Sequence, residues 1–262
     1  MKQYLTHLTK DSMDGSGNSA LDNLESILND QTIYAKNQHG WFMYNMDKFS
    51  NFLKRKFKTV SLTGLEIDQL SNFIDSKKSH EPKYQIKSCG LVFEKSILEE
   101  KGVRKVQHVK ENTWEEVVTK KKFHKIFSAN STFRKLLQNR QIKTVKKANK
   151  IINKFSCIDK IGSNYNWVDE EEYRINKDLE FSFSELSAII VEDPSSFKLI
   201  LKRSKRKKQM KLFRHNTRIL LLVKSKRRKI KDEIKAINIL INIPIISPYW
   251  SRKRILKGLE SK

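Results

Sequence analysis

Cysteine is scarce in this sequence, with only Cys89 and Cys157 among 262 residues. Two cysteines are too few for a disulfide framework, and these two lack the clustered spacing of a zinc site, so we expect a reducing, cytoplasmic compartment. The first ten residues have no apolar core of the kind that a secretory leader needs. The longest apolar stretch, residues 234–250, is interrupted by two asparagines and two prolines, so we expect no membrane-spanning segment and no membrane partner.

Several motifs of catalysis and phosphate binding are also missing. The glycine-containing loop at residues 14–18 matches neither GxxxxGK[ST] nor GxGxxG, and the sequence has no nucleophile elbow. The six histidines show no His-x-x-x-His spacing. The sequence therefore argues against ATP-driven, Rossmann-type, serine-hydrolase and metal-dependent activities, and we expect no metal.

Positive charge is abundant and concentrated in two segments. Residues 1–100 carry 13 basic and 13 acidic side chains and residues 151–200 carry 5 and 10, whereas residues 101–150 carry 15 and 3 and residues 201–262 carry 21 and 3. Such blocks can neutralise phosphates, so nucleic acid is the leading partner class. The alternative is a solvated lysine-rich surface. The candidate nucleic-acid-binding residues are Lys202, Arg203, Lys205, Arg206, Lys207, Lys208, Lys226, Arg227 and Arg228.

Strand-like and helix-like patterns alternate through much of the chain. Ser19 is a plausible N-cap for an amphipathic helix that begins near Leu21. The sequence therefore predicts an α+β fold on a split, strongly twisted antiparallel sheet with flanking helices. The other expected elements are a helix at residues 65–74, a helical turn at 96–101, and strands at 4–9, 32–35, 59–62, 84–93, 103–109, 173–183 and 186–191.

Changes in composition suggest how the chain is organised. We expect an α+β domain at residues 1–193, in which residues from about 110 to 156 form a basic helical insertion. Beyond Pro194 the sequence becomes a run of basic, helix-like stretches, so residues 194–262 are expected to form a basic C-terminal appendage. Its apolar segment, Ile237–Ile246, is expected to pack that appendage.

An acidic island stands out against this basic background. Residues 169–172 are four consecutive carboxylates, followed by Tyr173 and Arg174. Strand alternation would put Glu170, Glu172 and Arg174 on one face. A carboxylate fixed at a strand start could hydrogen-bond a ribose hydroxyl and stabilise positive charge at an anomeric carbon, which makes Glu172 the central candidate. The alternative is an exposed acidic turn that pairs with surplus lysines.

Four further residues, His7, Thr9, Ser61 and Thr63, add polar groups within or next to two of the expected strands. His7 lies near Thr9 on the first expected strand, and an imidazole beside hydroxyls can orient a ribose or an amide. The alternative is a structural histidine. Ser61 and Thr63 could add hydroxyls, although such residues are also common capping groups.

Five short segments together resemble the AbiGi-like abortive-infection proteins, which confer phage resistance in bacteria. That family typically shows a histidine–threonine start, an NLxSIL helix, a CFTDIP-like strand end, a YGIxFxK strand and a late ExEWR. Here Tyr173 replaces the tryptophan, and Gly64 and Leu65 stand where the family tends to have Ile-Pro. The matching segments are Tyr4–Thr9, Asp22–Leu28, Val60–Thr63, Cys89–Lys95 and Glu170–Arg174.

This pattern in turn resembles a divergent ADP-ribosyltransferase fold, as in DNA-modifying toxins of the DarT type. The resemblance implies NAD as the substrate and Glu172 and His7 as catalytic residues. The residues that it places around the cofactor are Thr9, Ser61, Thr63, Glu170 and Arg174.

The resemblance implies phage defence through transfer of ADP-ribose from NAD to a nucleic acid or a translation-related target. Two alternatives remain. The chain could be a non-catalytic, antitoxin-like or regulatory partner in a two-component abortive-infection system, in which case a cognate toxin or antitoxin protein is a partner. It could also be a nucleic-acid-binding protein without catalysis.

Overall fold

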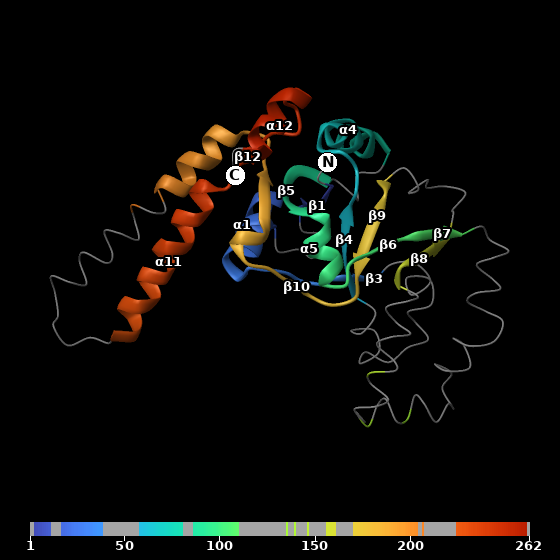
Figure 1. Ribbon diagram of the computed structural model, residues 1–262, viewed down its shortest axis with the longest axis horizontal. Coiled ribbons are helices and arrows are strands. Elements are labelled where there is room, and N and C mark those ends of the chain that lie inside the picture. The colour runs from blue at the N-terminus through green and yellow to red at the C-terminus, as the bar shows by residue number, and fades with distance from the viewer. Residues whose placement is uncertain are drawn as a thin grey trace. The chain divides into compact units, whose positions relative to one another are not determined.

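The computed structural model describes about three fifths of the chain in two compact units, and each unit is described by itself below (Figure 1). The expected basic insertion lies almost wholly outside the described residues. The first unit comprises Met1–Gln31, Leu65–Ile97 and Phe181–Lys262, and the second comprises Thr32–Gly64 and Leu98–Glu180. The described residues are 3–11, 17–38, 58–80, 86–109, 156–160, 170–203 and 224–260, with single positions at 135, 139, 146 and 206.

The first unit is built on four strands, β1 (Tyr4–Lys10), β5 (Ile86–Glu94), β11 (Leu186–Ile190) and β12 (Ile245–Ile246). Their order is β12-β11-β5-β1. β5 is antiparallel to both β1 and β11, whereas β11 and β12 are parallel. β5 is therefore a central strand, and most of its residues are buried.

Gly90 allows close approach of two backbones within this sheet. It lies opposite Leu8 on β1 and opposite Ile190 on β11. A Cβ atom at this position would collide with the backbone carbonyl oxygen of His7. Because backbone atoms cannot move aside as a flexible side chain can, only glycine fits here without displacing β1.

One face of this sheet is covered by helical elements. Val92 of β5 and Ile190 of β11 belong to a fully buried cluster with residues of η2 (Ile67–Gln69), α4 (Leu70–His80) and α12 (Arg252–Glu260). Burying these aliphatic side chains is the main favourable contribution to the stability of the unit. The remaining members of the cluster are Ile67, Leu70, Ile74, Ala188, Ile246 and Ile255.

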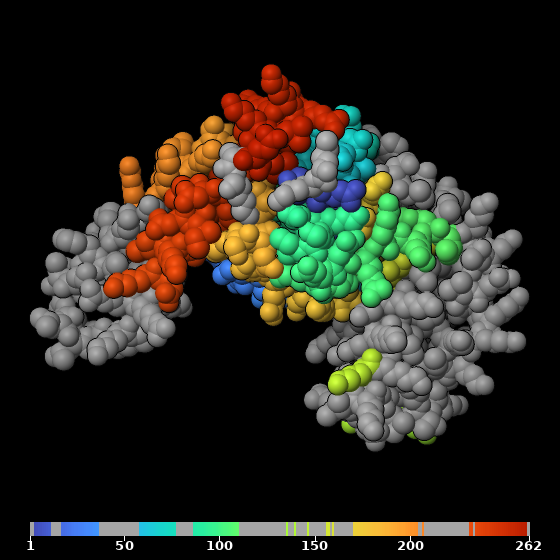
Figure 2. Space-filling view, in the orientation of Figure 1, coloured from blue at the N-terminus to red at the C-terminus, as the bar shows by residue number. Residues whose placement is uncertain are grey.

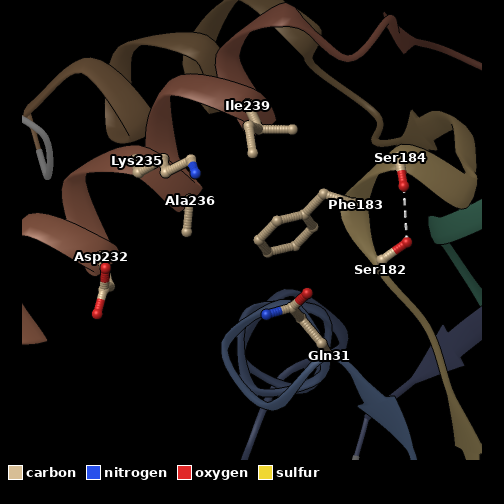
Figure 3. A pocket seen from close by; sticks show the side chains of 8 residues that line it. All are labelled: Gln31, Ser182, Phe183, Ser184, Asp232, Lys235, Ala236 and Ile239. Carbon is tan, nitrogen blue, oxygen red and sulfur yellow. Dashed lines mark hydrogen bonds between the residues drawn. The ribbon is translucent and has the colours of Figure 1, made fainter.

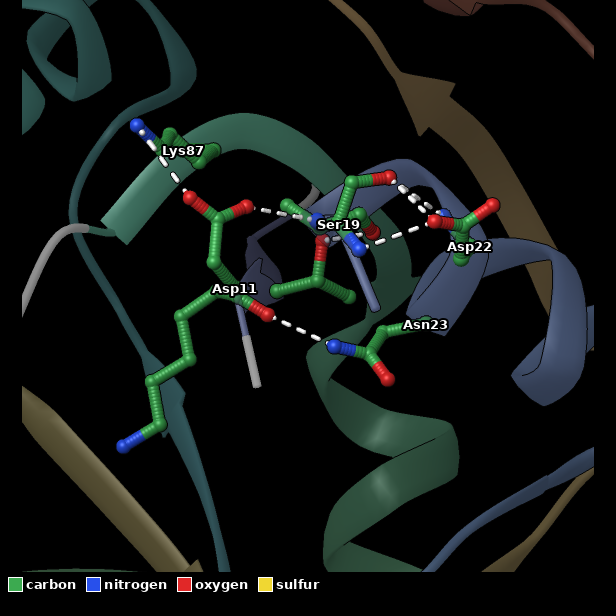
Figure 4. A network of polar contacts seen from close by, with 8 residues as sticks. Asp11, Ser19, Asp22, Asn23 and Lys87 are labelled. Atoms are coloured by element: carbon green, nitrogen blue, oxygen red, sulfur yellow. Dashed lines mark hydrogen bonds and ion pairs between the residues drawn. The ribbon is translucent and has the colours of Figure 1, made fainter. Parts of the chain in front are cut away.

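Helix α1 (Ala20–Asp30) begins in a polar network (Figure 4). Ser19 is its N-cap, as the sequence predicted, and the structure adds a capping box between Ser19 and Asp22. The Asp11 carboxylate accepts a hydrogen bond of 2.8 Å from the Ala20 N–H and pairs with the ammonium group of Lys87 at 3.4 Å. Asn23 donates to the carbonyl oxygen of Lys10 at 2.7 Å. These bonds fix the start of the helix against the end of β1 and satisfy backbone groups that a helix terminus leaves free.

The second unit contains a sheet whose central pair is β4 (Lys58–Thr63) and β9 (Glu172–Ile175). β9 is antiparallel to β4 on one side and to β6 (Arg104–Lys105) on the other, and β3 (Asn37–Gln38) pairs with β4. Two short ribbons complete the described part of this unit. They are antiparallel β2 (Thr32–Ile33) with β10 (Leu179–Glu180), and parallel β7 (Gln107–Val109) with β8 (Ile158–Lys160).

The expected single strand at residues 173–183 is wrong. β9 ends at Ile175, β10 covers only two residues, and the 3-10 turn η5 (Phe183–Glu185) follows. Asn176 donates a side-chain hydrogen bond to the Lys58 carbonyl at 2.8 Å, and the Asp178 carboxylate accepts one from the Ala35 N–H at 2.7 Å. These polar side chains bond to the backbone of neighbouring segments, which favours a turn over continued strand pairing.

The expected helical turn before Gly102 is confirmed. Helix α5 (Lys95–Glu100) precedes this glycine, whose φ of 97° lies in the left-handed region. The strand expected after it is present as the short strands β6 and β7.

The C-terminal residues contribute to the core of the first unit. Residues 194–203 are helical, and α11 (Lys224–Asn242) and α12 are surface elements (Figure 2). The apolar segment Ile237–Ile246 ends in β12, and its buried side chains Ile237, Leu240 and Ile246 face the interior. Because β12 pairs with β11, the expected appendage supplies a strand of this sheet.

The fold is mixed α+β, with mostly antiparallel sheets and flanking helices, as the sequence predicted. The parallel pair of β11 and β12 departs from a purely antiparallel arrangement. No helix in the part of the chain that the structure describes has the length and apolar character needed to cross a membrane.

Two buried threonines on β1 give a matched stability test. Thr6 is 1% exposed and its hydroxyl has no hydrogen-bond partner among the described residues, whereas the Thr9 hydroxyl, 4% exposed, lies 2.9 Å from the Ala20 carbonyl and 3.1 Å from that of Cys89. Valine matches the shape of threonine. We expect Thr6→Val to raise the free energy of unfolding by about 1 kcal/mol and Thr9→Val to lower it by about 1–2 kcal/mol. Urea denaturation measures both, and a loss of stability in Thr6→Val would contradict this account.

Burial also determines the reactivity of Cys89. Desolvation, followed by the charges of Glu192 and Asp11, raises the pKa of the thiol from 9.0 to about 11. At pH 8 we expect iodoacetamide to alkylate native Cys89 roughly a hundredfold more slowly than the unfolded chain, because the thiolate is the nucleophile. Unfolding restores the lower pKa, so this group also reduces stability as the pH rises above about 9. Mass spectrometry of the labelled peptide follows the reaction, and equal native and unfolded rates would refute the prediction.

Candidate functional site

The register of β4 and β9 brings four of the predicted residues together. Ser61 lies opposite Arg174, and Thr63 lies opposite Glu172. Directly opposed residues on antiparallel strands place their side chains on the same face of the sheet. Arg104 of β6 lies on the other side of Arg174, so this face crosses three strands.

Glu172 and Arg174 form a buried ion pair at the centre of this face. Glu172 is 6% exposed and Arg174 is 2% exposed. The Arg174 Nε donates to Glu172 Oε1 and its Nη2 donates to Oε2, both at 2.6 Å. This two-pronged contact holds the carboxylate in one orientation. The prediction that Glu172 and Arg174 share a strand face is confirmed, because their side chains meet.

A second carboxylate completes the cluster. Arg174 Nη2 also donates to Asp159 Oδ2 of β8 at 2.7 Å, and Nη1 donates to the Ser156 carbonyl oxygen at 3.1 Å. Four N–H groups of the guanidinium therefore have partners. Burial alone would lower the pKa of Arg174, but the adjacent carboxylates of Glu172 and Asp159 outweigh burial and raise this pKa above its ordinary value.

Asp159 was missed by the sequence reasoning. It lies 15 residues before Arg174, in a different strand, and no motif links the two. The only available signal was an acidic residue directly after Cys157 and Ile158, where a charged side chain in an apolar run needs a partner. We name Glu172, Arg174 and Asp159 the carboxylate–arginine cluster.

The turn before β9 is fixed by the end of β4. The Thr63 hydroxyl donates to the Glu170 carbonyl at 2.8 Å, and the Gly64 N–H donates to the Glu171 carbonyl at 3.0 Å. Glu171 has a φ of 48°, a left-handed conformation that costs on the order of 1 kcal/mol for a residue with a side chain. Gly64 leaves room for the Tyr173 ring, since a Cβ there would lie 2.7 Å from the ring. These contacts hold Glu172 at the first position of β9.

The remaining members of the acidic island have different surroundings. Glu170 precedes β9 and is partly exposed, so strand alternation does not extend to it. Glu171 is exposed and pairs with Lys105 at 3.4 Å, and the Lys105 ammonium also lies 6.0 Å from the centre of the Tyr173 ring. The alternative expectation, an exposed acidic turn that pairs with a lysine, is therefore correct for Glu171. It does not hold for Glu172, which is buried.

His7 and Thr9 belong to the first unit. His7 lies opposite Leu91 in the pairing of β1 with β5 and is partly exposed. The contacts of the Thr9 hydroxyl with the carbonyls of Ala20 and Cys89 tie β1 to α1 and β5, so this hydroxyl has a structural role. Proximity of His7 or Thr9 to Glu172 stays a prediction.

Some of the candidate nucleic-acid-binding residues are described. Lys202 and Arg203 are exposed at the end of the helix at residues 194–203, and Arg206 is exposed as well. Lys226, Arg227 and Arg228 lie in the first turns of α11. The side chains of this second group are not described, and Lys205, Lys207 and Lys208 lie outside the described residues.

The carboxylate–arginine cluster offers fixed charge. Two carboxylates surround one guanidinium, which leaves one formal negative charge that is shared within a buried site. Such a group can orient a polar ligand or stabilise an adjacent cation. Among the residues that the structure describes, no group of three or more histidine, cysteine, aspartate or glutamate side chains is arranged to hold a metal ion.

Comparison with known proteins returns no relative. No protein-family model, curated protein or solved structure matches this chain.

Removal of the guanidinium tests the energetics of the cluster. Arg174→Met leaves the buried Glu172 and the partly exposed Asp159 without their cation, and we expect the free energy of unfolding near pH 7 to fall by about 3–5 kcal/mol. Without Arg174, burial and mutual repulsion disfavour the charged forms of both carboxyl groups.

Lys105→Met is the matched control for this measurement. It breaks the exposed pair with Glu171, in which both side chains are about half exposed, so the expected loss is about 0–1 kcal/mol. Urea denaturation curves at pH 7 compare the variants. Equal losses in the two variants would show that the buried cluster does not contribute as described.

Proposed function

We propose that this protein acts in phage defence and transfers ADP-ribose from NAD to a nucleic acid or a translation-related target. The observation that supports this proposal is the register of β4 and β9. It places Ser61 and Thr63 beside Arg174 and Glu172, and these residues belong to two of the five segments that resemble the AbiGi-like proteins. The same resemblance supports an ADP-ribosyltransferase-like fold for the α+β arrangement.

In the proposed reaction, the bond between the nicotinamide nitrogen and C1 of its ribose breaks, and an acceptor atom of the target forms a new bond to that carbon. Nicotinamide leaves with the electron pair, and the acceptor releases a proton. Positive charge develops on the ribose in the transition state, and the negative charge of the carboxylate–arginine cluster would stabilise it. Ser61 would line the nicotinamide ribose, and His7 is the second proposed catalytic residue.

The contacts of Glu172 refine its proposed role. Arg174 holds both of its oxygens, so Glu172 is rigid and its charge is partly neutralised. A carboxylate already fixed in position does not have to reorganise when charge develops, which is the property that electrostatic catalysis needs. The cluster, with Asp159 included, is therefore the proposed catalytic group.

Label transfer from NAD tests the proposal directly. Purified protein is incubated with NAD labelled in its adenylate moiety and with bacterial RNA, DNA and ribosomes, and transferred label is counted. We expect Glu172→Gln to reduce transfer by at least about a hundredfold, because it removes the negative charge on the cluster. Ser61→Ala, which changes a partly exposed side chain beside Arg174, should reduce it less.

Glu171→Gln is the matched control. It changes the neighbouring carboxylate, which is exposed and paired with Lys105, and it should leave transfer unchanged. Thermal unfolding establishes that each variant is folded, since Glu172→Gln also weakens a buried pair. Full transfer by folded Glu172→Gln would rule out the cluster as the catalytic group.

A second candidate function is nucleic-acid binding without catalysis. It is favoured by the complete pairing of the Glu172 carboxylate and by the exposed side chains of Lys202, Arg203 and Arg206. In this case affinity should fall steeply with salt and should be the same in wild type and Glu172→Gln. Absence of label transfer together with such binding would favour this function.

A further inference from the structure

A pocket of about 280 Å³ opens in the first unit, between the C-terminal end of α1, the turn η5 and the middle of α11 (Figure 3). Its lining residues come from these three elements and include none of the candidate site residues that the sequence singled out. Pockets that bind small molecules typically span roughly 300–1,000 Å³. At the lower limit of that range, this pocket suits a small ligand better than a dinucleotide such as NAD.

The apolar part of the pocket is formed by Phe183 and by residues of α11. Phe183 is 6% exposed and its ring points between Ala236 and Gln31, whereas Ile239 at the edge is 40% exposed (Figure 3). The exposed Ile239 side chain beside the Phe183 ring provides an apolar surface that no other described residue covers. A planar heteroaromatic ring is a suitable ligand for such a surface.

Gln31 supplies a polar group next to this surface. It is the C-cap of α1 with φ 50° and ψ 36°, a left-handed conformation in which glycine or asparagine is usual. Its backbone is held by hydrogen bonds, because its N–H donates to the Ile27 carbonyl and its own carbonyl accepts from the Phe181 N–H at 2.9 Å.

The amide of Gln31 extends towards the pocket (Figure 3), and no hydrogen bond joins it to another described residue. An amide presents a donor and an acceptor side by side, as the edge of a nucleobase requires. A residue other than glycine in a left-handed backbone conformation is a reason to look for a function.

Charge on α11 favours a phosphate at the mouth of the pocket. Lys235 is exposed and lines the pocket, and α11 carries seven basic and two acidic residues. Asp232 also lines it and can accept a hydrogen bond from an amino group on a base. The excess of positive charge along the helix attracts polyanions.

We infer that this pocket binds one nucleoside monophosphate unit, either free or within a single strand of nucleic acid. The base lies against Phe183 and Ile239, the Gln31 amide contacts its edge, and Lys235 contacts the phosphate. The pocket lies apart in sequence from the carboxylate–arginine cluster, and binding requires no transfer of ADP-ribose.

Calorimetry on the full chain tests this site with three probes: adenosine, adenosine 5′-monophosphate and a short single-stranded oligoadenylate. Gln31→Gly removes the amide and introduces glycine, the residue best suited to the left-handed backbone conformation at this position. The variant should therefore fold at least as stably as wild type. We expect it to weaken binding of all three probes by about tenfold. Lys235→Ala should weaken binding of the two phosphate-bearing probes by about threefold or more and leave adenosine unchanged.

Lys231→Ala is the matched control, because Lys231 is exposed on the same helix but does not line the pocket. It should bind adenosine 5′-monophosphate as wild type does. Binding of the mononucleotide and the oligonucleotide with similar affinity would identify a free nucleotide as the ligand, and much tighter binding of the oligonucleotide would identify a strand. Wild-type affinity in both Gln31→Gly and Lys235→Ala, or no binding of any probe to wild type, would overturn the inference.

The outcome is separable from that of the proposed function. Glu172→Gln should bind all three probes as wild type does, because its change lies in the other unit. If label transfer fails while nucleotide binding is intact, the result bears on the carboxylate–arginine cluster alone. If label transfer is intact while nucleotide binding fails, the result bears on the pocket alone.

Discussion

The buried guanidinium of Arg174 is the constraint on which the second unit depends. A charge that is removed from water needs compensating charges and hydrogen bonds, and here these come from two carboxylates and a backbone carbonyl. Glu172 is a near neighbour on the same strand, but Asp159 and Ser156 precede Arg174 by 15 and 18 residues. Satisfying one side chain therefore fixes the position of the segment that contains β8 relative to β9.

The same constraint limits the chemistry available at Glu172. A free carboxylate has a full negative charge but no fixed orientation, whereas Glu172 has a fixed orientation and shares its charge with Arg174. Asp159 restores an excess of negative charge to the group, so the electrostatic effect on a ligand arises from three side chains together. A single glutamate is thus an incomplete description of the candidate site, even though its position at the start of β9 agrees with the sequence pattern.

Local features of this fold could be predicted from the sequence. Ser19 as N-cap, the strand that contains His7, and the shared face of Glu172 and Arg174 all follow from short-range rules of capping and alternation. The rest depends on contacts between distant segments. The bond from Arg174 to Asp159 and the parallel pairing of Ile245 and Ile246 with β11 have no local signature. The partners of Asn176 and Asp178, which are the backbone groups of Lys58 and Ala35, have none either. Each is determined by a partner elsewhere in the chain.

Helix α11 shows how packing and recognition can be separated within one element. Its buried residues Ile237 and Leu240 attach it to the first unit, while Lys235 and Ile239 stay at the surface beside the pocket. Positive charge along a helix gives affinity for phosphates without selecting among ligands, because Coulomb attraction is the same for any backbone. Selection requires groups of defined geometry, and the amide of Gln31, held by a strained backbone next to Phe183, is such a group. The basic residues of this chain and its pocket would thus perform different parts of one recognition process, the first by attraction and the second by shape and hydrogen bonding.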